Sequence, residues 1–271
     1  MRLSGSAWSF VGASLTESVG LYRAMGISGM ELLASPGGLL NSKKIIEDPV
    51  QEALRIRDLG VPVPNIIFLF GHDFHERALN HKDPGVRQRN AEDFSAVAEF
   101  CHQSGIPSVT VLPGIQQDGW SLEKSVAVSA EALNVLTAVA QGHGIQLLFE
   151  AHVGSILQRL EDSLQFLDRN PHLRLTLDYG HFTFGGYGQE EIDCLVPFAR
   201  HVHLRQAATK VLQARWEDGV VDFKKVINKL RTVNYSGYLT IEYEHDSWMD
   251  CDRVDVISEI IKMRNLVLSQ L

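Results

Sequence analysis

Short apolar runs and longer stretches with helical periodicity alternate along the whole of this 271-residue chain. Each apolar run has the length of a strand, and each intervening stretch repeats its apolar residues every three to four positions. Strands that alternate with helices, without a long linker between them, predict parallel β/α units. The eight expected strands are 3–10, 29–34, 64–70, 108–113, 145–150, 173–178, 201–205 and 238–244. The clearest helical stretches are 14–25, 47–59, 86–104, 121–142, 155–168, 222–232 and 252–268, with a short helix near 189–196 in a weaker, Gly-rich connection over 179–200.

Eight such repeats favour a closed (β/α)₈ barrel, which typically takes about 250 residues. A doubly wound open sheet is the alternative arrangement of the same units. Such a sheet usually carries a GxGxxG fingerprint after its first strand, and the stretch SAWSFVGAS at that place has none. The sequence therefore predicts an α/β fold, a single-domain TIM barrel.

Composition excludes several classes of partner and compartment. The net charge is −8 and Lys and Arg form no large cluster, so we expect no nucleic-acid partner. No apolar run approaches the ~18 residues of a membrane span, so we expect no membrane association. The three cysteines, Cys101, Cys194 and Cys251, have no CxxC spacing, and an odd number argues against a disulfide framework. We therefore expect a cytoplasmic protein.

Polar residues fall at the ends of the last four expected strands. Glu150 ends the fifth strand, Asp178 the sixth, and His203 and Glu242 lie near the ends of the seventh and eighth. In a TIM barrel the carboxyl ends of the strands meet at one mouth, where the chemistry is carried out. Each residue alone has a simpler interpretation, such as a helix cap or a satisfied core histidine. The coincidence of four potential ligands on consecutive strands favours a shared site.

Three carboxylates gathered at one mouth would repel one another strongly in a low dielectric. A divalent cation removes that cost, and carboxylates with one imidazole suit Mn²⁺, Mg²⁺, Co²⁺ or Zn²⁺. The sequence therefore predicts one divalent cation bound by Glu150, Asp178, His203 and Glu242. His72, which follows the third expected strand at the same rim, is a further candidate for the wall of a substrate pocket.

The motifs FEAH, LDYGHF, HVHLR, RWEDGVVDF and GYLTIEYE, with YRAMGISGMELL near the N-terminus, resemble the sugar phosphate isomerase/epimerase superfamily, the xylose isomerase-like TIM barrels. That superfamily includes ketose 3-epimerases, hydroxypyruvate isomerases, inosose dehydratases and endonuclease IV. The resemblance covers nearly the whole chain and implies one xylose isomerase-like TIM barrel domain over residues 1–271.

The resemblance also implies roles for individual residues. Glu150 and Glu242 match the residues that act as acid and base as well as binding the metal. His181 matches a histidine that contacts a substrate oxygen, and Arg215 matches an arginine that binds the substrate near the reacting carbons. Together they imply an isomerase or epimerase of a sugar or sugar phosphate. Such an enzyme removes a proton beside a carbonyl through a metal-stabilised enediolate.

Three other functions stay open. An inosose-type dehydratase would use the same proton abstraction and then expel a hydroxyl. An endonuclease IV-like nuclease is less favoured, because the fourth strand end, VTVLPG, lacks a histidine and Gln206 stands where many relatives carry Asp. The third alternative is a non-catalytic barrel that binds a sugar. The partner we expect is a small carbohydrate, whose identity and phosphorylation stay open, as do the native metal and a homo-oligomer.

Overall fold

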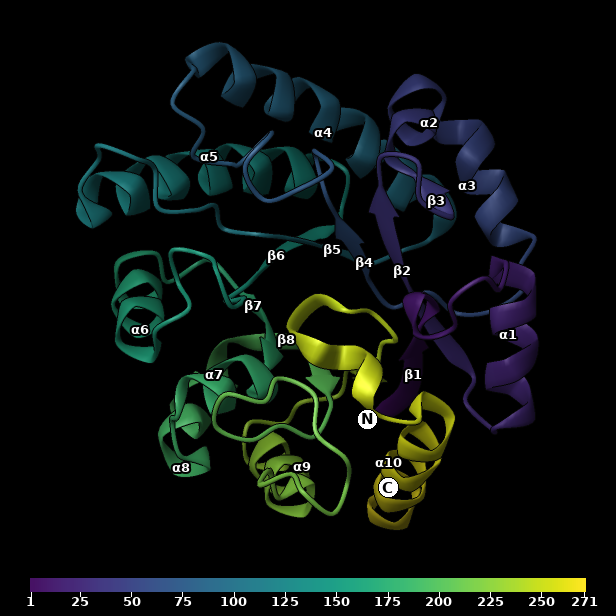
Figure 1. Ribbon diagram of the computed structural model, residues 1–271. Coiled ribbons are helices and arrows are strands. Elements are labelled where there is room, and N and C mark those ends of the chain that lie inside the picture. The colour runs from purple at the N-terminus through teal and green to yellow at the C-terminus, as the bar shows by residue number, and fades with distance from the viewer.

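The computed structural model of the protein describes all 271 residues and contains a closed barrel of parallel strands (Figure 1). The barrel strands pair in the order β1-β9-β8-β7-β6-β5-β4-β2, and the pairing of β1 with β2 closes the ring. Their bounds are β1 (Arg2–Ser6), β2 (Gly29–Ser35), β4 (Ile66–Phe68), β5 (Ser108–Val111), β6 (Gln146–Glu150), β7 (Leu175–Asp178), β8 (Ala199–Leu204) and β9 (Tyr238–Ile241). A two-residue strand, β3 (Leu40–Asn41), pairs only with β2. The predicted TIM barrel is confirmed.

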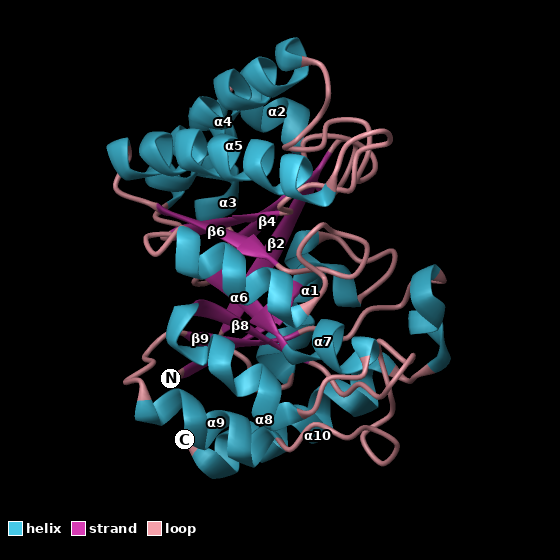
Figure 2. Cartoon of the chain, turned by 90° about the vertical axis from the view of Figure 1, so that its left-hand side faces the viewer, coloured by secondary structure: helices cyan, strands magenta, loops and turns pink.

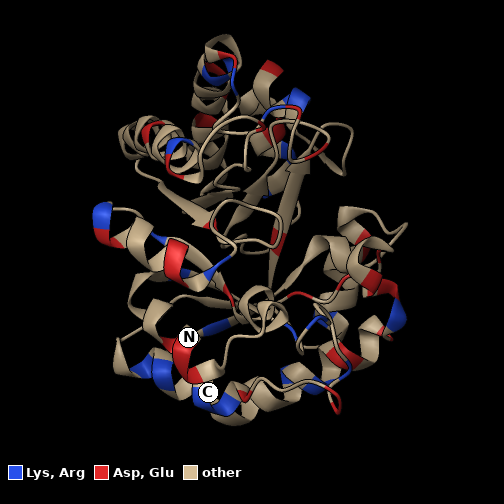
Figure 3. Cartoon of the chain, turned by 60° about the vertical axis from the view of Figure 1, so that its left-hand side comes forward, with Lys and Arg blue, Asp and Glu red and all other residues tan.

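The helices surround the strands, as two perpendicular views show (Figures 1 and 2). They are α1 (Leu15–Ala24), α2 (Ser42–Glu47), α3 (Pro49–Arg57), α4 (Pro84–Ser104), α5 (Leu122–Gly142), α6 (Leu160–Arg169), α7 (Tyr179–Gly185), α8 (Gln189–Ile192), α9 (Phe223–Thr232) and α10 (Val256–Gln270). Three 3₁₀ turns are η1 (Ala7–Ser9), η2 (Asp193–Phe198) and η3 (Trp248–Arg253). In the view of Figure 3, acidic and basic residues are mixed along the outer helices. None of the helices combines the length and the apolar character needed to cross a bilayer.

Helix starts follow the capping signals of the sequence. Ser14 caps α1 in a capping box, in which its side chain accepts from the backbone N–H of Glu17 and the Glu17 side chain accepts from that of Ser14. Ser121 and Asp83 cap α5 and α4 through their side-chain oxygens. Each such cap stabilises its helix by about 1 kcal/mol.

The helix predicted over 47–59 corresponds to α3, which begins and ends two residues inside that range, and a separate helix, α2, precedes it. Asp48 stands between α2 and α3 with extended backbone and accepts a hydrogen bond from the N–H of Gln51. Pro49 then opens α3, since a proline is tolerated in the first turn and its ring clashes with a preceding turn of helix.

Segments that follow strand ends differ most from the expectations. The helices predicted over 155–168 and 252–268 begin later, as α6 and α10, because a loop precedes α6 and the 3₁₀ turn η3 precedes α10. The connection over 179–200 begins with α7 directly after Asp178, where a Gly-rich loop was expected. His181 therefore lies on a helix and is held by it.

The interior of the barrel contains a layer of buried polar side chains, although such interiors are usually filled by branched apolar residues. Three members stand two residues before Asp178, His203 and Glu242 along their strands, so the layer lies one step deeper than the mouth. We call it the interior polar layer; it consists of Ser4, Glu31, Asn65, Thr110, Thr176, His201 and Thr240. Its side chains are joined by hydrogen bonds of 2.6 to 3.1 Å from strand to strand across the barrel.

Candidate metal centre at the barrel mouth

The structure brings together the four residues that the sequence places at strand ends. Glu150 and Asp178 are the last residues of β6 and β7, His203 is the last but one of β8, and Glu242 follows β9 directly. One ligand atom from each lies within 4.8 Å of the others, and all four residues are buried. Parallel strands of similar length explain this convergence, since their carboxyl ends meet at one rim.

Asp178 is oriented by the start of α7. Its Oδ1 atom accepts a 2.6 Å hydrogen bond from the backbone N–H of Gly180, as a helix cap does. A Cβ at position 180 would stand 3.0 Å from that oxygen and 3.3 Å from Nε of Arg205, so the close turn favours glycine. The cap uses one carboxylate oxygen and leaves Oδ2 directed at the other residues of the site.

Arg205 is the residue of the site that sequence reasoning missed. Its side chain is only 2% exposed, and Nη2 lies 2.6 Å from Oδ2 of Asp178 and 3.7 Å from Oε2 of Glu242. Nη1 pairs with Glu244 at 3.2 Å. The signal was present, because alternation along β8 puts His203 and the residue two positions later on the same, inward face.

His181 lies beside the same groups. Its Nε2 atom is 3.1 Å from Nη2 of Arg205, 3.6 Å from Oδ2 of Asp178 and 4.0 Å from Oε1 of Glu150. Burial lowers the pKa of His181 well below its usual value, and neighbouring cationic groups add to the effect. The imidazole is therefore neutral and able to exchange hydrogen bonds with a ligand. We call these residues the mouth cluster; it consists of Glu150, Asp178, His181, His203, Arg205 and Glu242.

The pKa values within the mouth cluster show an excess of buried negative charge. Burial raises the pKa of Glu150 to about 7, although the hydrogen bond with His203 acts in the opposite direction. Burial also raises the pKa of Asp178 and outweighs the ion pair with Arg205. Burial alone would lower the pKa of His203, but the charges of Glu242 and Glu31 raise it well above its usual value. The raised pKa values mean that bound protons reduce the negative charge, which the cationic side chains of the cluster do not balance by themselves.

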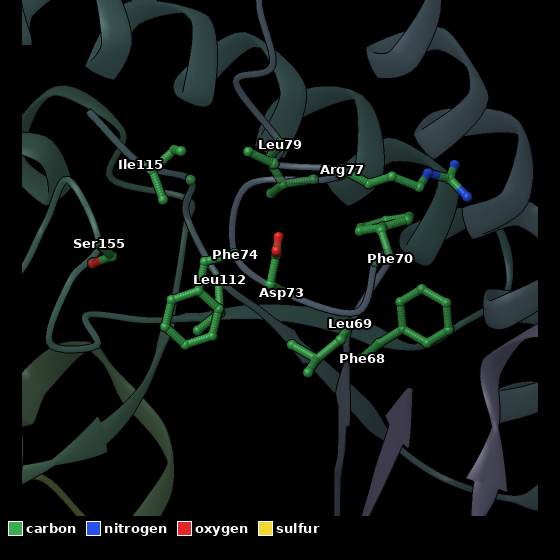
Figure 4. Close-up of a pocket in the computed structure, with 13 residues that line it drawn as sticks. Phe68, Leu69, Phe70, Asp73, Phe74, Arg77, Leu79, Leu112, Ile115 and Ser155 are labelled. Atoms are coloured by element: carbon green, nitrogen blue, oxygen red, sulfur yellow. The ribbon is translucent and has the colours of Figure 1, made fainter. Parts of the chain in front are cut away.

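Aromatic side chains from three loops cover the mouth cluster. The ring of His152 lies 4.1 Å from that of His181, centroid to centroid. Trp248 stacks on His152 at 5.2 Å from the loop after β9, and Phe74 meets it edge-on at 5.1 Å from the loop after β4. Phe74 also lines a cavity of about 30 Å³, next to Asp73 and facing Ser155 (Figure 4). That cavity is adjacent to the cluster and contains none of its residues.

The structure does not bring two of the predicted substrate-binding residues to the mouth cluster. The side chain of Arg215 is 68% exposed, and its one ion pair, with Asp218, is 3.9 Å long. His72 is exposed in the loop after β4, where its backbone N–H donates to Glu76. Both roles stay predictions, whereas Arg205 supplies the guanidinium that the site contains.

The donor set fits a divalent cation. Three carboxylates and one imidazole face one another with only one guanidinium among them, and oxygen with imidazole ligands suit Mg²⁺, Mn²⁺, Co²⁺ or Zn²⁺. Oε2 of Glu242 is buried without a hydrogen-bond partner, although it lies 3.0 Å from Nδ1 of His203. A buried carboxylate oxygen of this kind costs free energy unless a ligand satisfies it.

Comparisons with known proteins agree with this geometry. Residues 19–265 match the family model described as xylose isomerase-like TIM barrel. The chain belongs to this family. The resemblance inferred from the sequence motifs is therefore confirmed.

Curated relatives of this family member include inosose dehydratases. One from Clostridium perfringens (strain 13 / Type A) is 29% identical over 140 residues, which cover 43% of this chain and 46% of that protein. The chain thus spans less than half the length of that relative. Inosose dehydratase 1 of Bacillus cereus (strain ZK / E33L) is 23% identical over 270 residues, which cover 91% of this chain and 80% of that protein.

Solved structures share the fold over almost the whole chain. A 3-keto-D-glucoside 4-epimerase from E. coli has a TM-score of 0.73 at 16% identity and covers 98% of this chain and 99% of its own. An L-ribulose 3-epimerase has a TM-score of 0.74 at 18% identity, with coverage of 100% and 94%. A zinc-bound IolI protein has a TM-score of 0.73 at 14% identity, with coverage of 100% and 98%. At these identities the likeness shows the barrel architecture.

Proposed function

We propose that the protein is a divalent-metal-dependent isomerase or epimerase of a sugar or sugar phosphate, which removes a proton from the carbon beside a carbonyl. The observation that carries this proposal is the pair of buried carboxylates at the mouth. Oε1 of Glu150 and Oε2 of Glu242 lie 3.1 and 3.0 Å from the same atom, Nδ1 of His203. Two carboxylates beside one ligand position are what a two-base proton transfer requires.

Glu150, Asp178, His203 and Glu242 would hold the cation. A bound cation of this class acts as a Lewis acid that stabilises negative charge on a neighbouring oxygen. The interior position of these residues keeps bulk water away, which strengthens every charge interaction in the site.

Glu150 is suited to proton transfer at neutral pH. In the ion-free protein burial raises the pKa of this carboxyl to about 7, and a bound ion would favour its ionised form, which accepts a proton. Burial acts to raise the pKa of Glu242, but His203 and Arg205 outweigh it, so that carboxylate stays ionised and able to accept a proton. We assign proton removal and proton return to this pair.

Arg205 and His181 complete the proposed site. The guanidinium stands beside Asp178 and Glu242, so it can stabilise negative charge that develops on a substrate oxygen. We assign to Arg205 the cationic role that the resemblance implied for Arg215. His181, neutral and adjacent to the guanidinium, is placed to hydrogen-bond a substrate hydroxyl.

A metal-dependent dehydratase is the second candidate, because both curated relatives described above are inosose dehydratases. The same carboxylate would remove the proton, after which a hydroxyl on the next carbon leaves as water. For this reaction we assign protonation of that hydroxyl to Glu150, whose pKa is raised by burial. The two candidates share the ligands and the first step and differ in the fate of the deprotonated substrate.

Incubation in deuterated water with Mn²⁺ tests both candidates. The panel consists of ketoses, their phosphates and an inosose, and NMR follows deuterium uptake while ultraviolet absorbance follows an unsaturated product. We expect deuterium uptake with formation of an epimer or isomer. Loss of water would establish the dehydratase instead, and binding of a sugar without either reaction would overturn catalysis. Glu150→Gln is the matched control, because it keeps the shape of the side chain and removes the acid.

A further inference from the structure

The buried carboxylate of Glu31 has no role in the proposed reaction, yet it touches one of the proposed metal ligands. Its Oε2 atom lies 2.9 Å from Nε2 of His203 and 3.1 Å from Nε2 of His201. β2, which carries Glu31, pairs with β1 and β4, whereas β8 pairs with β7 and β9. The contact therefore crosses the interior of the barrel and is not a by-product of strand pairing.

The two nitrogens of His203 face different groups. Nδ1 faces Glu150 and Glu242 at 3.1 and 3.0 Å, on the side of the mouth. Nε2 faces Glu31 on the side of the interior polar layer. An ionised carboxylate only accepts hydrogen bonds, so a proton must reside on Nε2. If an ion displaces the proton on Nδ1, the lone pair of the neutral imidazole is left on that nitrogen, between Glu150 and Glu242.

Glu31 is itself held in place by its neighbours. Nδ2 of Asn65 donates to Oε1 of Glu31 at 2.6 Å and to Thr110 at 2.8 Å. Oδ1 of Asn65 accepts from Ser108 at 2.7 Å, which fixes the orientation of the amide. Oε1 is thereby engaged, and Oε2 is directed at the imidazoles. A carboxylate buried this deeply is costly unless such partners meet it.

We propose that Glu31 is the positioning residue of the metal centre: it keeps the proton of His203 on Nε2 and the ring turned so that Nδ1 faces the ion. This inference rests on the proposed metal site. Carboxylates that accept from the distant nitrogen of a ligating histidine orient the ring and make it a better ligand. Removing them typically weakens metal binding ~10- to 100-fold.

The alternative is that Glu31, His201 and His203 themselves hold an ion, since their ligand atoms also lie within 4.8 Å of one another. Hydrogen bonds account better for this group. Nε2 of His201 is shared with Oγ1 of Thr240 at 2.8 Å, and Glu31 has its second oxygen bound to Asn65. The distances of 2.9 and 3.1 Å between Glu31 and the two imidazoles are those of ordinary N–H···O hydrogen bonds.

The test compares Glu31→Gln and Glu31→Ala with Thr110→Val. Thr110 belongs to the same layer and bonds to Asn65 and Thr176, but it touches neither His203 nor any other proposed ligand. Binding of Mn²⁺ and Zn²⁺ to each folded protein is measured by titration calorimetry. We expect one ion per chain in the wild type, ~100-fold weaker binding in Glu31→Ala, a smaller loss in Glu31→Gln, and wild-type affinity in Thr110→Val.

A second readout does not depend on a bound ion. In protein with ¹⁵N-labelled histidine, NMR should show a slowly exchanging proton on Nε2 of His203, lost in Glu31→Ala and kept in Thr110→Val. Three results would each overturn the proposal. They are unchanged metal affinity in both Glu31 variants, an Nε2 proton signal of His203 that persists in Glu31→Ala, and binding of two ions per wild-type chain. If the wild type binds no ion, the proposed function fails, and the NMR signal alone then decides whether Glu31 fixes the ring.

Discussion

The interior polar layer and the mouth cluster are both buried and both polar, but they differ in how their polar atoms are satisfied. Each side chain of the layer has hydrogen-bond partners, and Glu31 accepts from three other residues. In the mouth cluster, Oε2 of Glu242 and Nε of Arg205 are buried without a partner. The layer is therefore complete as folded, whereas the cluster needs a ligand to complete it. Changes in the layer away from Glu31 and its donor Asn65 should affect stability, and changes in the cluster should affect binding and catalysis.

The largest expected effect comes from neutralising a carboxylate of the mouth cluster. Glu150→Gln and Glu242→Gln should each lower turnover by ~10³-fold, the range in which general acid–base catalysis contributes. The melting temperature of ion-free Glu150→Gln should not fall, because burial disfavours the charge of that carboxylate. That of Glu242→Gln should fall, because the change removes the negative partner of His203 and Arg205. Steady-state kinetics and thermal melting measure the two effects. Near-wild-type turnover in either variant would end the two-carboxylate mechanism.

Removing the guanidinium should be costly in stability when no ion is present. Arg205→Met leaves Asp178 and Glu242 without their cationic neighbour, and breaking a buried ion pair in this way costs about 3 kcal/mol. Added Mn²⁺ should recover part of the loss, because the ion supplies positive charge to the same carboxylates. Urea unfolding with and without Mn²⁺ measures this, and Arg215→Met, at an exposed arginine, is the matched control. Equal stability of both variants would contradict the assignment.

A change inside the interior polar layer that leaves Glu31 and its donor Asn65 in place should act on stability alone. Thr110→Val removes the hydroxyl that bonds to Asn65 and Thr176 and should lower the free energy of unfolding by about 2 kcal/mol, the cost of leaving buried polar atoms unsatisfied. Turnover per folded molecule should stay close to that of the wild type. Urea unfolding and active-site titration check the two statements. A large loss of turnover with unchanged stability would erase the distinction between the two regions.

The affinity for the ion should depend on pH. The raised pKa of Glu150, about 7, means that this carboxyl holds a proton in more acidic solution, and the ion must displace it. Affinity should therefore rise with pH, with a loss approaching tenfold for each unit below about 7. The proton on Nδ1 of His203 would add to the slope. Calorimetric titration across this range tests the prediction, and a flat profile would contradict it.

The smallest effects should come from the exposed loop residues. Arg215→Ala and His72→Ala should change the free energy of unfolding by less than about 0.5 kcal/mol, as exposed positions usually do. Turnover and KM should also stay unchanged, because neither side chain reaches the mouth cluster. A clear rise in KM in either variant would instead support the substrate-binding role predicted from the sequence.

The sequence predicted those parts of the site that the strands control. The order of strands and helices specifies a barrel, and parallel strands bring Glu150, Asp178 and Glu242 to one rim whatever the loops do. Alternation along β8 likewise determines that His203 points inward. Arg205 could have been found by the same rule.

Other parts could not be predicted from one sequence. Glu31 stands in the run GMELLA, which specifies a strand but says nothing of the partner across the barrel. That partner depends on the stagger and tilt of strands that are distant in sequence. Trp248 and Phe74 come from loops, whose paths are set by local turn chemistry and contacts rather than by hydrophobic periodicity. For the same reason the positions of Arg215 and His72, which also lie in loops, could not be predicted from the sequence.

One imidazole of the mouth cluster, that of His203, also contacts the interior polar layer through Glu31, and this limits how an enzyme built on this barrel can diversify. A substitution of His203 would disturb the interior polar layer and the mouth cluster together. This position therefore has little freedom to vary when the specificity of the enzyme changes. The loops that carry Phe74, His152 and Trp248 have no such contact with the interior polar layer. Substrate specificity is therefore most easily changed by substitutions in the loops that carry these aromatic side chains, with the mouth cluster beneath them kept as it is.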